Sequence, residues 1–171
     1  EKTKRRLAEM GYGEDILTVI RQNFANIDLV AEEYGKFNFV LADLGVSSMQ
    51  IDNPERGFTY KYEGPLDLRL DPTKGTSATE RLRELTQDEL EGMLVTNSDE
   101  PYAAEIAKAV ITAFRKGETI ETTTQLKSVI EQALSFLPEK EKKEAVKKAC
   151  ARTFQALRID VTSEFEVLEA F

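Results

Sequence analysis

The fold prediction starts from Phe37-Asn38-Phe39-Val40-Leu41-Ala42-Asp43, an almost wholly apolar run that ends in a carboxylate. Short apolar runs of this kind are typical of strands that are buried on both faces of a parallel sheet. An earlier run, Ile16-Leu17-Thr18-Val19-Ile20, has the same character. A helix is expected between the two runs, starting at Asn26 or Asp28 and ending at Gly35. Strand, helix and strand with short links predict a parallel βαβ unit and therefore an α/β fold.

Asp43 follows the second predicted strand directly and is the first candidate for a ligand-binding residue. In open α/β sheets, ligands bind beyond the carboxyl ends of the strands. The other interpretation is structural, with the carboxylate accepting hydrogen bonds from backbone N–H groups of the turn at residues 44–48. A buried carboxylate without partners is costly, so both interpretations place donors near Asp43. The residues alone leave both open.

A long loop is predicted over residues 44–76, which are rich in proline and glycine and show no periodicity. A loop of this length within a compact chain is either functional or disordered. The aromatic residues Phe58, Tyr60 and Tyr62 alternate as they would in an extended segment, which favours order.

The sequence beyond this loop is expected to be helical. Two capping boxes, Thr86 with Glu89 and Thr122 with Gln125, mark the starts of helices. In such a box each side chain accepts a hydrogen bond from the other residue's backbone, which satisfies two otherwise unpaired donors.

A helix is also expected from Pro101 to near Gly117, with an apolar stripe that includes Ile106 and Val110. Two further helices are predicted, a short charged one over residues 139–148 and an amphipathic one over residues 154–168. This order divides the chain into two parts. Residues 1–50 and 150–171 form a partial α/β core. Residues 51–149 form the loop and a helical insert.

The composition excludes several kinds of chemistry. The 171 residues include no histidine, which excludes Ser-His-Asp hydrolysis and every histidine-ligated metal site. The single cysteine, Cys150, excludes a disulfide framework and is interpreted as a small packing residue. Catalysis therefore has to use carboxylates, hydroxyls, amides, the backbone or a bound cofactor, and no metal site is predicted.

Charge gives little sign of a polyanion-binding protein. The net charge is −8 and no segment of domain size is basic, although the stretch from Arg56 to Arg83 has six basic residues against four acidic ones. The lysines of residues 140–148 alternate with glutamates, which indicates a solvated helix face rather than an RNA-binding arm. The glycines form neither GxGxxG nor GxxxxGK[ST], so neither nucleotide-binding loop is present.

The chain contains no apolar run long enough to cross a membrane, and its first ten residues do not form a signal peptide. It starts without methionine and within a helical pattern, so we expect further sequence upstream.

Four motifs give a more specific indication. They are Asp43-Leu44-Gly45-Val46-Ser47-Ser48-Met49-Gln50-Ile51-Asp52, Pro54-Glu55-Arg56-Gly57-Phe58, Gly64-Pro65-Leu66-Asp67-Leu68-Arg69-Leu70-Asp71 and Arg152-Thr153-Phe154-Gln155-Ala156-Leu157-Arg158-Ile159. In sequence and in order they closely resemble the bacterial 16S rRNA (cytosine-N4) methyltransferase family, and the resemblance covers essentially the whole chain.

The resemblance implies a cytoplasmic enzyme that uses S-adenosylmethionine to methylate a cytidine of the small-subunit rRNA or the 30S ribosomal subunit. It also implies a partial Rossmann-like sheet with an all-helical insert. By motif match, Phe24, Asp43 and Gln50 are the expected cofactor-binding residues. An aromatic ring can pack on adenine, and a carboxylate and an amide can bind the polar groups of the cofactor.

Four residues are candidates for substrate binding: Arg56, Phe58, Arg152 and Arg158. Arginines can contact phosphates, and aromatic rings can stack on a base that leaves its helix. The alternative for the arginines is an ion pair that fixes the long loop, and for Arg69 we favour this alternative. No general base is assigned.

The chain also departs from the family pattern. The Gly-rich first motif is expected before residue 1 and a later SFHSLEDR-type motif after residue 171, so the chain resembles a central fragment that is inactive alone. Two alternatives from other classes remain: a non-catalytic module that binds rRNA or the ribosome, and a helical interaction module.

Overall fold

The computed structural model describes residues 2–13, 15–43 and 45–171. The chain forms two compact units, Glu1–Leu41 with Glu166–Phe171 and Ala42–Phe165, each of which is described by itself. The domain division predicted above remains a prediction.

The first unit contains helices joined by irregular segments. These are α1 (Lys2–Glu9), the 3-10 turn η1 (Phe24–Asn26), α2 (Ile27–Tyr34) and most of α9 (Glu164–Ala170). Gly35, at φ 89°, ends α2 as predicted, because this left-handed conformation favours glycine. Asn26 occupies the N-cap position of α2, as one of the two predicted starts, but its side chain forms no capping hydrogen bond. Asn23 caps η1 and accepts a hydrogen bond from the Ala25 N–H.

The predicted partial Rossmann-like α/β sheet is wrong. Within the described residues there is no strand, and both segments expected as strands, 16–20 and 37–42, are irregular. Phe39 is 79% exposed and Leu41 81% exposed, so these side chains are not in a core. A buried parallel strand requires neighbouring strands and covering helices. Two short apolar runs alone cannot supply them, whatever their local pattern.

The second unit is helical. After α3 (Ser48–Ile51) and the 3-10 turn η2 (Pro54–Arg56) come α4 (Ala78–Glu84), α5 (Gln87–Ser98), α6 (Ala103–Arg115), α7 (Thr123–Ala133) and α8 (Glu139–Thr162). Both predicted capping boxes are confirmed, at the starts of α5 and α7. Ser77 and Glu80 form a further box at α4.

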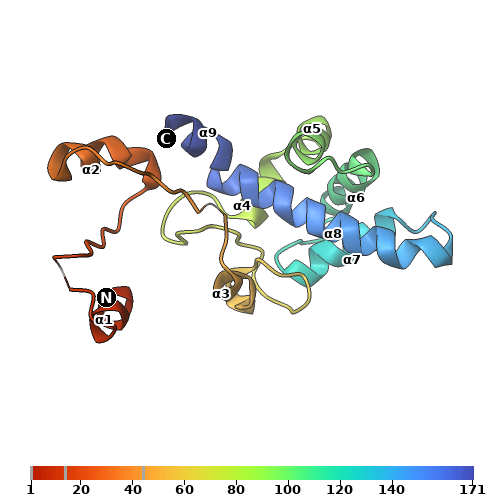
Figure 1. Cartoon of the computed structure of the whole chain (residues 1–171). Coiled ribbons are helices and arrows are strands. Elements are labelled where there is room, and N and C mark those ends of the chain that lie inside the picture. The colour runs from red at the N-terminus through yellow and green to blue at the C-terminus, as the bar shows by residue number, and fades with distance from the viewer. Residues whose placement is uncertain (1, 14, 44) are drawn as a thin grey trace. The chain divides into compact units, whose positions relative to one another are not determined.

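Helix α8 is one element of 24 residues, not the two separate helices predicted (Figure 1). Its charged first half and amphipathic second half share one buried stripe, which includes Val146, Cys150, Phe154 and Leu157. Because these residues recur every three or four positions and no proline or glycine lies between them, the helix continues to Thr162.

The core of the second unit lies between α8 and the helices beside it. Helix α5 packs on α6 and α8, α6 on α7, and α7 and α4 on α8. Two polar contacts join α8 to its neighbours: Arg81 pairs with Asp160 at 2.7 Å, and the Asn97 amide donates to the Ala156 carbonyl at 3.2 Å.

The long loop is ordered, as the aromatic spacing predicted. Phe58, Leu66 and Leu68 are buried in the same core as the helices. An isolated bridge joins Pro65 to Thr122, and the Leu66 N–H donates to the Glu121 carbonyl at 2.8 Å. No helix among the described residues has the length and apolar character needed to span a bilayer. The described residues also contain no cluster of potential metal ligands.

Candidate functional site

One open pocket of about 440 Å³ in the second unit brings the four sequence motifs together. Motif residues far apart in the chain share its lining: Val46 and Ile51 from the first motif, Phe58 from the second, Leu68 from the third, and Phe154, Gln155 and Arg158 from the fourth. Tyr60 and Ala151 complete the lining. Helix α8 supplies the fourth motif, and the long loop places the others against it.

Aromatic side chains form much of the pocket wall. The rings of Tyr60 and Phe154 are 5.5 Å apart at an interplanar angle of 57°, and Phe58 is 9% exposed. The Tyr60 hydroxyl donates to the Lys147 carbonyl at 3.3 Å, which fixes this ring against α8. Burial raises the pKa of Tyr60, so the phenol is neutral at physiological pH. An apolar wall with a few polar groups is typical of a site for a small organic ligand or a base.

Arg158 is the basic residue of the pocket lining. Its Nη2 donates to Glu164 Oε2 at 3.0 Å. The Arg158 Nε and Glu164 Oε1 atoms are both buried, and neither has a hydrogen-bond partner among the described residues. Arg158 thus lines the pocket while it is paired with Glu164, and its role in substrate binding remains a prediction.

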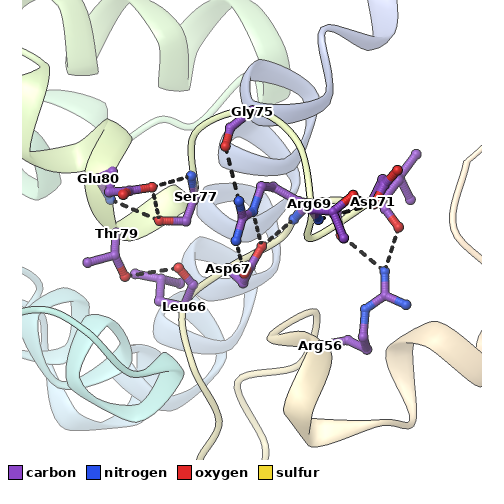
Figure 2. Close-up of polar contacts among 11 residues, drawn as sticks. Arg56, Leu66, Asp67, Arg69, Asp71, Gly75, Ser77, Thr79 and Glu80 are labelled. Carbon is purple, nitrogen blue, oxygen red and sulfur yellow. Dashed lines mark hydrogen bonds and ion pairs between the residues drawn. The ribbon is translucent and has the colours of Figure 1, made fainter.

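The long loop is held in place by arginines (Figure 2). Arg69 donates to both carboxylate oxygens of Asp67, at 2.8 and 2.7 Å, and to the Gly75 carbonyl at 3.0 Å. This hydrogen bonding lowers the pKa of Asp67. The structural interpretation of Arg69 is thus confirmed.

Arg56 also fixes the loop, although through carbonyls rather than carboxylates. Its Nη2 donates to the carbonyl groups of Arg69 and Leu70, at 3.1 and 2.8 Å. Its guanidinium carbon lies 5.7 Å from the centre of the Phe58 ring. Arg56 therefore positions Phe58 in the pocket wall. Binding of substrate by Arg56 and Phe58 remains a prediction.

Arg152 is half-buried and is not part of the pocket lining. Its charge acts on Glu100, a buried carboxylate that is 2% exposed. Burial raises the pKa of Glu100, while the Tyr102 N–H and the charge of Arg152 act in the opposite direction. A role for Arg152 in substrate binding remains a prediction.

The three predicted cofactor residues belong to different units. Phe24, in the first unit, is 40% exposed and packs edge-to-face on Phe171 at 5.6 Å. Gln50, in the second, lies in α3, and its Oε1 accepts from the Ser47 N–H at 2.8 Å, which leaves the amide NH₂ without an assigned partner within the described residues. Their roles in cofactor binding remain predictions.

Asp43 does not end a strand, because residues 37–42 are irregular. Its carboxylate is exposed and makes no hydrogen bond within the described residues. The alternative role, as an acceptor for the turn at residues 44–48, involves Leu44, which lies outside the described residues. An exposed carboxylate without a described partner can accept hydrogen bonds from hydroxyl groups of a ligand.

Comparison with known sequences identifies the family. The sequence profile of the MraW methylase family matches residues 1–171, the full length of the chain. The chain belongs to the MraW methylase family.

Three relatives of this MraW family chain have closely similar sequences. Ribosomal RNA small subunit methyltransferase H 1 of Agathobacter rectalis is 65% identical over the whole chain and 49% of its own length. The protein of the same name in Lachnoclostridium phytofermentans is 60% identical over 99% of the chain and 46% of its own length. Ribosomal RNA small subunit methyltransferase H 2 of Alkaliphilus metalliredigens is 58% identical over 99% of the chain and 49% of its own length. The chain thus spans about half the length of these relatives.

A second surface of this MraW family chain was not predicted from its sequence. Lysines at positions 127, 140, 142, 143 and 147 line a groove of about 780 Å³ beside α7 and α8. Along the sequence these lysines alternate with glutamates, which suggested a solvated face. The spacing of Lys140, Lys143 and Lys147, three and then four residues apart, is the signal that places them on one side of a helix.

Proposed function

We propose that this chain supplies the central part of an S-adenosylmethionine-dependent rRNA methyltransferase. The reaction is transfer of a methyl group to N4 of a cytidine in the 16S rRNA of the small ribosomal subunit, in the bacterial cytoplasm. The observation that supports it best is the convergence of four family motifs on one aromatic pocket. Membership of the MraW methylase family gives the class of reaction.

The proposed cofactor-binding residues fit the polar groups of a nucleoside. The exposed Asp43 carboxylate can accept hydrogen bonds from ribose hydroxyls. The Gln50 NH₂ can donate to an acceptor of the ligand, because its oxygen already binds the Ser47 N–H. The exposed ring of Phe24 offers a surface for adenine. The cofactor, when bound, supplies the electrophilic methyl group.

The residues of the pocket orient the cytosine. Tyr60, Phe58 and Phe154 form a wall on which an unstacked base can lie, and Arg158, which also lines the pocket, is the proposed contact for an adjacent acceptor. The exocyclic amine of cytosine is a weak nucleophile, so most of the acceleration is expected from alignment of the reacting atoms. No side chain of the pocket lining is a carboxylate or histidine, and no general base is assigned.

Cofactor binding is tested by calorimetry with S-adenosylmethionine. The printed chain is compared with a longer chain that includes the upstream Gly-rich segment expected from the family resemblance. We expect little heat from the printed chain and saturable binding by the longer one. In the longer chain, Asp43→Asn is expected to weaken binding about tenfold, which corresponds to one lost charged hydrogen bond. The matched control is Asp52→Asn, since Asp52 is also exposed and lies in the same motif.

Methyl transfer is tested with 30S subunits and radiolabelled cofactor, followed by digestion of the rRNA and mass spectrometry of the nucleosides. N4-methylcytidine is the expected product. Methylation at another atom would overturn the N4 specificity. Binding of rRNA without cofactor binding by the longer chain would favour the non-catalytic module, and binding of neither would favour the helical interaction module.

A further inference from the structure

The lysine-lined groove is the second large concavity of the unit Ala42–Phe165, and its lining is dominated by charged residues. Its volume is about 780 Å³. The lining residues come from the long loop, α7 and the first half of α8: Tyr60, Lys127, Glu131, Glu139, Lys140, Lys142, Lys143, Glu144, Val146, Lys147 and Cys150.

The groove has an excess of positive charge that the protein itself does not neutralise. Two of its three glutamates are already paired, Glu131 with Lys127 at 3.7 Å and Glu144 with Lys148 at 3.6 Å. The remaining four lysines form no ion pair within the described part of the chain: Lys140, Lys142, Lys143 and Lys147. Among the groove-lining glutamates, Glu139 is the one that forms no ion pair within the described residues, and Glu141 lies beside the groove on the same helix turn. This local excess contrasts with the net charge of −8 of the whole chain.

Three of these lysines lie near the amino-terminal end of α8. Helix α8 starts at Glu139, so Lys140, Lys142 and Lys143 lie in its first two turns. The amino-terminal end of a helix carries a partial positive charge within its first turn, which in α8 holds Lys140 together with Glu139 and Glu141. An anion bound in the groove would interact favourably both with the lysines and with this end of the helix.

Tyr60 connects the groove to the pocket at which the four motifs converge. Its ring lines both concavities, and its hydroxyl donates to the carbonyl of Lys147, one of the groove lysines. A polyanionic chain in the groove therefore passes directly beside the aromatic wall of the pocket. A single-stranded RNA has this chemistry, with phosphates for the lysines and a base for the pocket.

We propose that the groove binds the phosphate backbone of the RNA whose base enters the adjacent pocket. This inference rests on the proposed function for the nature of the RNA, but the groove can be tested without methylation. The phosphate contacts hold the strand in position, and the pocket selects the base.

The experiment measures binding of a fluorescent single-stranded RNA oligonucleotide by anisotropy at several salt concentrations. The test variant is Lys140→Gln with Lys143→Gln and Lys147→Gln. The matched control, Lys74→Gln with Lys108→Gln and Lys116→Gln, removes the same charge from elsewhere in the unit. Circular dichroism checks that both variants fold. Measurements use the printed chain and the longer chain.

We expect the groove variant to bind RNA about tenfold more weakly at low salt, with a slope of log affinity against log salt smaller by about 2, because three phosphate contacts are lost. The control variant should bind like the unchanged protein. Equal affinities and slopes for the two variants would overturn the proposal. Tighter binding of a polyglutamate peptide than of RNA would also overturn it, because the partner would then be an acidic protein.

Failure of the proposed function has a different signature. In the longer chain, cofactor binding by calorimetry should be unchanged in the groove variant, because no groove lysine is a predicted cofactor residue. A longer chain that binds RNA through the groove, but shows no cofactor heat, would support the groove and overturn methylation.

Discussion

Arg69 and Asp67 form a two-point ion pair across Leu68, with 2.8 Å between Nε and Oδ1 and 2.7 Å between Nη2 and Oδ2. Leu68 is 1% exposed and has φ 64°, a left-handed conformation that costs a non-glycine residue about 1–2 kcal/mol. The ion pair and the burial of Leu68 offset this cost. Leu68, the residue of the third motif that lines the candidate pocket, is therefore a strained residue that its neighbours hold in place.

Replacement of Asp67 should destabilise the loop in a pH-dependent way. Asp67→Asn is expected to lower the free energy of unfolding by about 1–3 kcal/mol at pH 7, because hydrogen bonds to a charged group are lost. Hydrogen bonding to Arg69 lowers the pKa of Asp67 below 3.8, so its contribution is complete above that pH and is lost as the pH falls through the folded-state pKa. Urea titrations at pH 7 and in acid measure both effects.

The matched control for Asp67→Asn is Glu121→Gln. Glu121 pairs with Arg83 at 2.7 Å, but these side chains are 57% and 46% exposed. The loss of an exposed ion pair is expected to cost less than about 1 kcal/mol. If the two variants lose equal stability, the ion pair across Leu68 does not fix the loop.

A methyl group at Gly64 should also destabilise the loop. A Cβ atom there would collide with the carbonyl of Pro54, and one on Gly57 would collide with the carbonyl of Pro65, so these two loop segments pack backbone to backbone. Gly64→Ala is therefore expected to cost about 1–3 kcal/mol in thermal or chemical unfolding. Gly92→Ala, in α5, is the control because its Cβ would meet open space, and it should stabilise by about 0.5–1 kcal/mol. Equal behaviour of both alanines would contradict the close approach.

The sequence predicts the features that depend on neighbouring residues. Thr86 and Glu89, or Thr122 and Gln125, are three residues apart, and the capping hydrogen bonds need nothing beyond that turn of helix. Gly35 ends α2 for an equally local reason. The order of the loop also follows from a local pattern, the alternation of its aromatic residues.

The features that were wrong or missed depend on distant residues. The runs at 16–20 and 37–42 have the composition of buried strands, yet a strand needs partners that composition does not provide. The candidate pocket joins Val46 to Arg158, more than a hundred positions apart in the printed sequence, which no local period reveals. The groove lysines were missed because their alternation with glutamates was considered along the chain and not around the helix.

Glu100 should make stability fall as the pH rises. Its Oε1 accepts from the Tyr102 N–H at 3.0 Å, while its Oε2 is buried without a hydrogen-bond partner among the described residues. Burial raises the pKa of Glu100, so its contribution to stability is fully present below its ordinary value of 4.5 and is lost as the pH rises through the folded-state pKa. Glu100→Gln cannot ionise and should show a flatter profile of melting temperature against pH above 4.5. Superimposable profiles for the two proteins would contradict this account.

The thiol of Cys150 should be almost unreactive in the native protein. Cys150 is fully buried, and burial, with the nearby charge of Glu131 as a smaller cause, raises its pKa to about 12. The thiolate is the reactive form, and at pH 8 this shift reduces its population about a thousandfold relative to an ordinary cysteine. In buffer at pH 8, Cys150 should therefore react with Ellman's reagent more slowly than an ordinary cysteine, by at least this factor. The same chain unfolded in guanidinium chloride is the control and should react fast. Rapid reaction of the folded protein would show that the base of the lysine groove opens to solvent. If the reaction is slow, its rate reports transient opening between α7 and α8, and RNA bound in the groove should slow it further.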